Sequence, residues 1–230
     1  MTPGLQSAAP ALRRDAAANR ERILAAAVEV FSASGAEAGI DEVARRAGVG
    51  VGTVYRRFPT KDALLAEIVA QLLRDLVTVA QDALEAAPDT GLAEFLTGAG
   101  ELQARHAGCL WQLWSGGHEG SETLRELRAI GQELLARAQT SGAVRSELVY
   151  EDIGMLLWSL AGVVESAHGV DPQLWRRTLD IMLHGMKPAA QKLAHPPLPP
   201  GGLDAVARQA TLSKTADIPC PPPMHMVSRP

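Results

Sequence analysis

The chain has 230 residues, enough for one or two domains, and its 47% of hydrophobic residues is ordinary for a globular protein. Its cysteines, Cys109 and Cys220, lie far apart. A disulfide framework is therefore excluded, and a reducing compartment is the simplest interpretation. Apolar runs are too short or too interrupted by charges for a signal peptide or a membrane span, so we expect a soluble, cytoplasmic protein without a membrane partner.

The net charge of −4 is unevenly distributed along the chain. Residues 1–70 hold nine Lys and Arg against eight Asp and Glu, whereas the remaining residues hold thirteen against eighteen. Binding a few DNA phosphates requires only a local basic edge, so the acidic total does not exclude nucleic acid. The residues that could form this edge are Arg13, Arg14, Arg20, Arg22, Arg45, Arg46, Arg56, Arg57 and Lys61.

The N-terminal part divides into an arm and a helix. Residues 1–15 are rich in Ala, Pro and Ser without apolar periodicity, which predicts a mobile arm. Arg13 and Arg14 of this arm could enter a minor groove of DNA, as N-terminal arms do elsewhere. From Ala17 to Ser34 apolar residues recur at helical spacing, which predicts a helix that Gly35 ends.

Two short helices separated by a tight turn are predicted next. Residues 41–47 carry apolar side chains at helical spacing, and Gly48 can adopt the left-handed conformation that ends a helix. Gly50 is the expected N-cap of a second helix over residues 51–58. This order is typical of a helix-turn-helix, whose second helix enters the major groove of DNA.

Residues 20–68 closely resemble the DNA-binding domain of the tetracycline-repressor (TetR) family. The matching features are Arg20-Glu21-Arg22-Ile23-Leu24, Phe31, Gly35, and Phe58-Pro59-Thr60-Lys61-Asp62-Ala63-Leu64-Leu65. Gly50 stands where a capping serine is common in the family, and Arg57 where a histidine often precedes the phenylalanine. Glycine is only a few tenths of a kcal/mol worse than serine as an N-cap, so the fold is not threatened.

The resemblance implies DNA contacts from the helix over residues 51–58, with Lys61 holding a backbone phosphate. The first turns of such a helix can approach base edges, and the polar residues that follow can reach phosphates or bases. The alternative is that these are surface residues of a helical bundle, since arginines on short helices usually form a solvated face. The expected DNA-binding residues are Val51, Gly52, Thr53, Tyr55, Arg56, Lys61 and Arg45.

The rest of the chain shows helical periods only. Thr60 can cap a helix over residues 60–79. This helix is longer than a three-helix domain needs, so it must link the DNA-binding domain to a further part of the chain. Further helices are expected over residues 92–107, 110–115, 122–140, 150–167 and 172–186. We therefore expect an all-α fold, with an N-terminal three-helix helix-turn-helix domain joined by a long helix to a helical ligand-binding and dimerisation domain. The expected parts are the arm (1–15), the helix-turn-helix domain (16–66), the effector-binding and dimerisation domain (67–190) and a tail (191–230).

Residues 153–164 are apolar nearly all round, which a helix tolerates only when both of its sides are buried. One side is expected to face the core of the chain and the other a partner subunit. The helix that follows is its companion in the four-helix dimer interface that the resemblance implies. The expected interface residues are Leu156, Leu157, Leu160, Val164, Leu179 and Met182.

The aromatic residues in the second domain have two interpretations, of which the functional one is that they line an apolar effector pocket. The other is ordinary core packing together with surface histidines. His106 and Cys109 have a metal-like spacing, but no second pair completes it, so we expect neither a metal nor a cofactor. The expected pocket residues, for a small apolar or amphipathic effector of unknown identity, are Trp111, Trp114, Trp158, Met155 and His106.

Nine of the fifteen prolines lie in the last thirty-six residues, which predicts an extended or disordered tail. A short helix over residues 203–212 is an equally open alternative. No nucleophile elbow, phosphate-binding loop or HExxH sequence is present, so we expect no enzyme.

Together these observations predict a ligand-responsive transcriptional regulator, most simply a homodimeric repressor of a near-palindromic operator on double-stranded DNA. A DNA-binding architectural or cell-division protein on the same scaffold, without an effector, is the alternative. A third possibility, a helical enzyme or small-molecule carrier, would bind its ligand without any effect on DNA affinity. The sequence leaves open the effector, the operator, the regulated genes, the direction of regulation and the role of the tail.

Overall fold

The computed structural model describes residues 8–35, 38–110, 121–167 and 169–215, and every regular element in these ranges is a helix. The predicted all-α fold is therefore confirmed. In this described part, no helix is long and apolar enough to cross a membrane. The helices are α1 (Ala8–Ser34), α2 (Ile40–Ala47), α3 (Val51–Arg57), α4 (Lys61–Leu84), α5 (Gly91–Arg105), α7 (Glu122–Thr140), α8 (Tyr150–Ala167), α9 (Leu174–Met186) and α10 (Gly202–Thr215).

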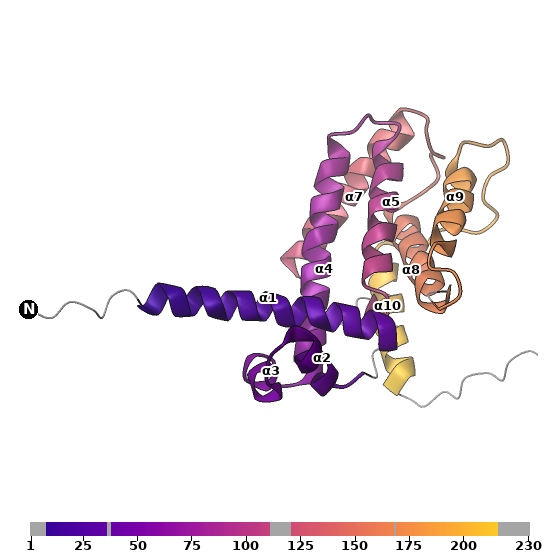
Figure 1. Cartoon of the computed structure of the whole chain (residues 1–230). Helices are drawn as coiled ribbons and strands as arrows, with labels where there is room; N and C mark the ends of the chain where they lie inside the picture. Colours follow the sequence, from indigo (N-terminus) through magenta and orange to yellow (C-terminus); the bar gives the residue numbers. More distant parts are fainter. Residues whose placement is uncertain (1–7, 36–37, 111–120, 168, 216–230) are drawn as a thin grey trace, which may run out of the picture.

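The first three helices and the start of α4 form an N-terminal domain at one end of the molecule (Figure 1). α1 lies across the α2–α3 pair, and its apolar side chains enter a common core with those of the other helices. We call this cluster the N-terminal core; its largest members are Ile23, Phe31, Ile40, Val43, Val54, Phe58, Leu64, Leu65 and Ile68.

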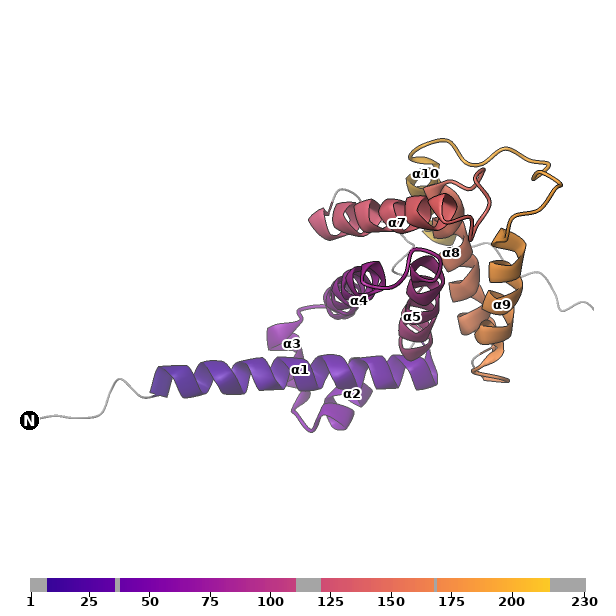
Figure 2. The ribbon, with the colours of Figure 1, turned by 90° about the horizontal axis from the view of Figure 1, so that it is seen from above.

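α1 begins at Ala8, so the prediction of an arm over residues 1–15 is wrong for residues 8–15. Residues 8–18 contain six alanines, and alanine is the best helix former. Seen from above, this part of α1 extends beyond α2 and α3 (Figure 2). The missing apolar stripe in residues 8–15 therefore did not mean that a helix is absent there.

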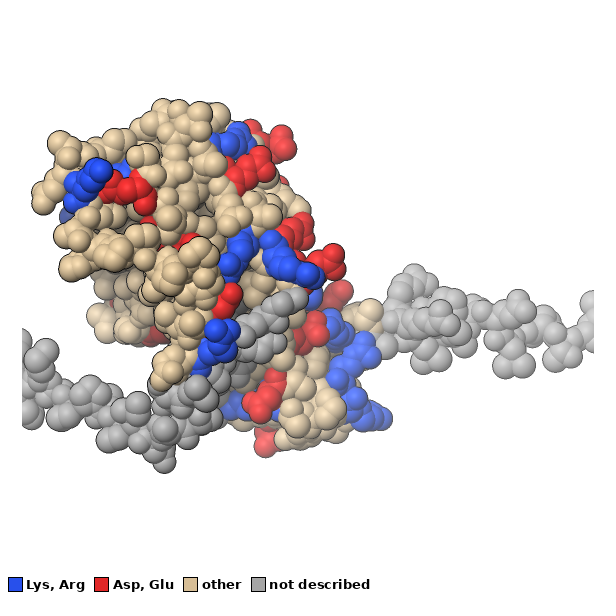
Figure 3. Space-filling view, turned by 180° about the vertical axis from the view of Figure 1, so that it is seen from behind, with Lys and Arg blue, Asp and Glu red and all other residues tan. Residues whose placement is uncertain are grey.

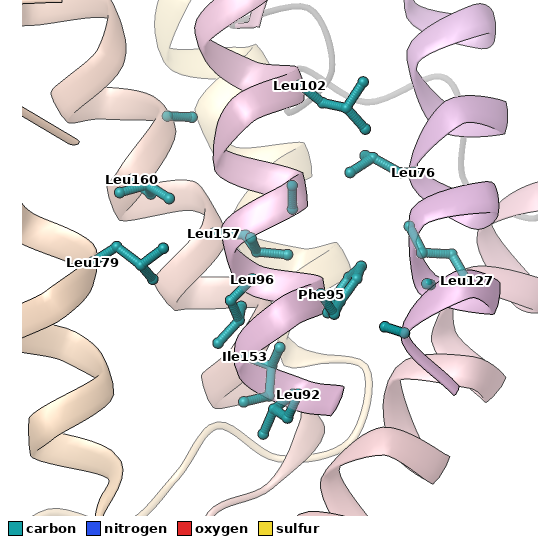
Figure 4. Close-up of a cluster of buried hydrophobic side chains, with 14 of the residues drawn as sticks. Leu76, Leu92, Phe95, Leu96, Leu102, Leu127, Ile153, Leu157, Leu160 and Leu179 are labelled. Atoms are coloured by element: carbon teal, nitrogen blue, oxygen red, sulfur yellow. The ribbon is translucent and has the colours of Figure 1, made fainter. Parts of the chain in front are cut away.

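α4 continues out of the N-terminal domain and packs against α5 and α7. With α8 and α9 these helices enclose a second cluster, which we call the C-terminal core. Figure 4 shows part of the C-terminal core, to which α4 contributes Leu76, α5 contributes Phe95 and α8 contributes Leu157. A short apolar repeat on every helix thus suffices to build one continuous interior.

An ion pair between Arg20 of α1 and Glu67 of α4 also holds these two helices together. The Arg74 guanidinium, on α4, lies 3.3 Å from the same Glu67 carboxylate. Burial alone would raise the pKa of Glu67. The hydrogen bonds and charges of Arg20 and Arg74 outweigh it, so the pKa of Glu67 lies below its ordinary value.

This lowered pKa makes part of the stability depend on pH. The stabilisation is complete above the pKa of Glu67 in the unfolded chain, about 4.3, and is lost as the pH falls through its lower value in the folded chain. We expect Arg20→Ala to reduce the free energy of unfolding at pH 7 by about 0.2 to 1 kcal/mol and to flatten its decline in acid. Denaturant unfolding at pH 7 and in acid measures this. Arg22→Ala, on the same helix, should keep the parent's acid dependence.

The tail contains the helix α10, so the alternative prediction of a helix over residues 203–212 is confirmed, and the prediction of an extended or disordered segment is wrong for residues 202–215. α10 packs on α8, where the Leu203 side chain fills the space beside Gly154; a Cβ there would lie 2.2 Å from it. Arg128 of α7 donates to both carboxylate oxygens of Asp204 at 3.1 and 3.2 Å. An apolar contact and an ion pair therefore offset the ordering cost of this helix despite the prolines around it.

Candidate nucleic-acid interface

The turn between α2 and α3 has the geometry that its glycines predicted. Gly48 ends α2 in the left-handed conformation, with φ 67° and ψ 34°. The Val49 N–H then donates to the Ala44 carbonyl at 3.0 Å, and the Gly50 carbonyl accepts from the Thr53 N–H at 2.8 Å. The N-cap Gly50 offers no side chain to α3, whose N-terminal end carries the partial positive charge of a helix N-terminus.

α3 buries one side and exposes the other. Val54 is fully buried and Phe58 is 5% exposed, which fixes the helix on the N-terminal core. Tyr55 is 48% exposed, so its ring and hydroxyl are accessible at the surface. Gly52 is exposed, and a Cβ built on it would meet no described atom within 4 Å, so the backbone of the first turn can approach a ligand closely.

Of the polar residues predicted to bind DNA, Thr53 and Arg56 lie on this side of α3 together with Tyr55, whereas Lys61 and Arg45 come from the neighbouring helices. Arg56 donates to the Thr53 hydroxyl at 3.2 Å, so the two form one polar group. Lys61, at the start of α4, has its ammonium 5.7 Å from the centre of the Phe31 ring. Arg45 faces Glu42 at 3.8 Å. Figure 3 shows Lys and Arg side chains gathered at one side of the N-terminal domain.

The structure therefore leaves Gly52, Tyr55 and Arg56 exposed on α3, and Lys61 begins the next helix four residues after the end of α3. A short helix that exposes Gly52 and Tyr55 and carries a cation at Arg56 has a shape and charge that fit the major groove between two phosphate backbones. Arg45 is the outlier, because it lies on α2 beside an acidic partner. Its carboxylate neighbour competes with any phosphate for the guanidinium.

The residues predicted for an effector pocket do not form one group. Trp111 and Trp114 lie outside the described residues. His106 ends α5, and its Nδ1 is 2.9 Å from the Leu102 carbonyl oxygen. Trp158 is partly buried on α8. Met155 is partly buried on α8, so its assignment to a pocket stays a prediction.

Four of the residues predicted for a dimer interface are buried within the single chain. Leu157, Leu160, Val164 and Leu179 are all less than 10% exposed and belong to the C-terminal core, so they cannot present a surface to a second chain. Their assignment to the interface is therefore wrong. The prediction failed because the sequence of a helix that is apolar all round does not reveal which side faces the core of its own chain. Leu156 and Met182 remain partly exposed, Leu156 at the edge of the core.

The exposed apolar surface lies elsewhere on the same helices. On one side of α9, Leu174 is 43% and Ile181 60% exposed, and they share this side with Thr178 and Gly185. On α8 the outward residues are small or apolar, and a Cβ on Gly162 or Gly185 would meet no described atom within 4 Å. The polar residues Arg176, Asp180 and His184 lie on the other exposed side of α9, whereas Arg177, three residues after Leu174 and four before Ile181, borders the apolar side.

Comparison with known proteins gives two family matches. Residues 23–68 match the model of bacterial regulatory proteins of the tetR family, and residues 84–188 match the C-terminal domain of SbtR-like transcriptional regulators. A curated HTH-type transcriptional regulator of Staphylococcus aureus (strain bovine RF122 / ET3-1) is 34% identical over 68 residues. That match spans 29% of this chain and 37% of the length of the relative.

Solved structures resemble most of this chain. A TetR transcription regulatory protein from Mycobacterium vanbaalenii is 33% identical, with a TM-score of 0.53 over 77% of this chain and 99% of that one. A gamma-butyrolactone receptor described as ArpA-like is 20% identical, with a TM-score of 0.57 over 86% and 99% of the two chains. At this lower identity the second likeness concerns the fold alone.

Proposed function

Because the chain belongs to the TetR family of bacterial transcriptional regulators, we propose that it is a ligand-responsive repressor that binds a near-palindromic operator as a homodimer. The observation that carries this proposal is the exposed side of α3, with Tyr55 and the Arg56–Thr53 pair beside an open first turn. The family and fold are those of DNA-binding regulators and not of enzymes. We also propose a cytoplasmic location, where the DNA is.

In this proposal the first turn of α3 lies in the major groove. Val51 offers apolar contact to thymine methyl groups, and Gly52 lets the backbone approach the base edges. Because neither residue donates a hydrogen bond from its side chain, much of the discrimination comes from Tyr55, Thr53 and the shape of the DNA.

Dimerisation is proposed through the outward sides of α8 and α9. Their exposed Leu174 and Ile181 would be buried against the same surface of a second copy, as a two-fold interface requires. The small residues Gly162 and Gly185 let the helices of two chains approach closely. Met182, beside this surface, stays a candidate contact.

An effector is proposed to bind in the C-terminal domain. The receptor named among the similar structures supports a ligand-binding role for this fold. An apolar or amphipathic effector would favour a conformation in which the two N-terminal domains no longer match the operator, and DNA must then weaken effector binding by the same factor. Its identity stays open.

Selection of bound fragments from a random DNA pool tests the proposal. We expect one inverted-repeat sequence, because a two-fold dimer presents two identical α3 helices. Recovery of many unrelated sequences would instead favour an architectural protein without an effector. Recovery of no enriched sequence would contradict specific DNA binding altogether.

Lys61 is predicted to contact a phosphate, which carries no sequence information. We expect Lys61→Ala to weaken binding to all duplexes about equally and to reduce the slope of log affinity against log salt by about 0.9. Titrations at several salt concentrations measure this slope. Lys187→Ala, at the far end of α9, is the matched control and should leave the slope unchanged. An unaltered slope in Lys61→Ala would remove this residue from the interface.

A further inference from the structure

The turn over residues 106–110 joins the two domains of the chain. It follows α5, and its residues enter both interiors: Cys109 is 1% exposed and packs in the N-terminal core, whereas Leu110 is fully buried in the C-terminal core. Burial, with the charge of Glu165 adding to it, raises the pKa of Cys109 to about 12, so the thiol stays neutral and acts as an apolar group. Any movement of this turn must therefore move both cores.

A carboxylate of α8 holds the turn. The Gly108 N–H donates to both oxygens of Glu165 at 2.9 Å, and the Leu110 N–H donates to Oε1 at 3.1 Å. Hydrogen bonds from backbone N–H groups to a carboxylate are among the stronger ones in proteins. Glu165 thus ties the turn to the helix that carries the proposed dimer surface.

On its other side the turn lies against the end of α1. The Ser32 hydroxyl donates to the Ala107 carbonyl at 2.9 Å. Gly108 has φ 83°, and a Cβ there would lie 2.0 Å from the Phe31 carbonyl oxygen, so the two backbones are in direct contact. The Phe31 ring in turn lies under the Lys61 ammonium. A continuous set of contacts therefore leads from Glu165 to a predicted phosphate contact.

We propose that Glu165 is a positioning residue, whose carboxylate holds the turn over residues 106–110 against α1 and so fixes the orientation of the N-terminal domain on the C-terminal domain. In a dimer this orientation sets the distance between the two α3 helices. The inference rests on the proposed function, because that distance matters only to a dimer that binds two half-sites.

The test compares two duplexes with the full-length protein: the inverted repeat recovered from the random pool, and the same duplex with one half-site scrambled. We expect Glu165→Ala to lower the ratio of the two affinities about tenfold, with little change for the single half-site. When the N-terminal domain is held less firmly on the C-terminal domain, the effective concentration of the dimer's second N-terminal domain at its half-site falls, whereas α3 itself is unaltered. Thermal unfolding is recorded in parallel.

Asp152→Ala is the matched control. Asp152 also lies on α8 and also accepts a backbone N–H, that of Val149 at 2.9 Å, but it is about 20 Å along the helix from Glu165. It should leave the ratio unchanged. Glu165→Gln keeps one acceptor oxygen, so we expect a ratio of affinities between those of the parent and Glu165→Ala. If Glu165→Ala does not fold, the test uses Glu165→Gln instead.

Ser32→Ala weakens the same turn from the α1 side and should lower the ratio in the same direction. Because both side chains hold one turn, the effects of Ser32→Ala and Glu165→Ala should not add in the double variant. An unchanged ratio in folded Glu165 variants, or an equal fall in Asp152→Ala, would overturn the inference. A parent protein without any preference for the inverted repeat would overturn the proposed function itself, and the inference with it.

Discussion

Leu160→Asp is expected to give a chain that does not fold, and Ile181→Asp a folded monomer. Leu160 is 1% exposed in the C-terminal core, where an unpaired carboxylate costs several kcal/mol, a large part of the stability of a domain. Ile181 is 60% exposed, so the same substitution changes the stability of one chain by about 0.5 kcal/mol or less. It would, however, place two charges in the proposed two-fold interface.

Circular dichroism and light scattering separate the two results. Loss of helical signal is expected only in Leu160→Asp, and a halved mass with an intact helical signal only in Ile181→Asp. The monomer should also bind the inverted repeat no better than a single half-site. A dimer that persists in Ile181→Asp would show that the interface lies on another surface.

Tyr55→Ala is expected to remove most of the preference for the operator, by about 10- to 100-fold in affinity, and to leave the fold intact. Its half-exposed ring contributes little to the N-terminal core, whereas a contact to a base edge is worth about 1 to 3 kcal/mol. Competition between operator and unrelated duplex measures the preference. Tyr55→Phe, which keeps the ring, separates the part played by the hydroxyl.

The neighbouring Val54 provides the contrast. It is fully buried, so Val54→Ala should lower the free energy of unfolding by about 2 kcal/mol. Operator affinity of the fraction that stays folded should change little. If Tyr55→Ala retained its affinity within a few-fold, the side of α3 that faces DNA would have to be reassigned.

Local signals explain why so much of the N-terminal domain could be predicted. Gly48 at a left-handed position and Thr60, whose hydroxyl accepts the Ala63 N–H at 3.0 Å, act within a few residues, so they can be recognised in the sequence. The same holds for the alternation of buried Val54 and exposed Tyr55 on α3. These features need no knowledge of the rest of the chain.

Features that depend on distant contacts were not predictable. The apolar residues of α8 did not show which of them face α5, because that choice depends on the whole C-terminal core. The hydrogen bonds of Glu165 to Gly108 join positions 57 residues apart. A glycine after the end of α5 indicates a turn but gives no sign of what holds it. The helix α10 likewise depends on Leu203 meeting Gly154.

The placement of Cys109 has a consequence for how this protein can be divided or synthesised. A fragment that ends with α4 would contain all the helices of the N-terminal domain but would leave a vacant space where this side chain packs. Such a fragment should be less stable than the same domain in the full chain, since an unfilled cavity destabilises its surroundings. During translation the domain would reach its final packing only after α5 has left the ribosome. Exchange of DNA-binding domains between relatives would also have to match the residue at this position.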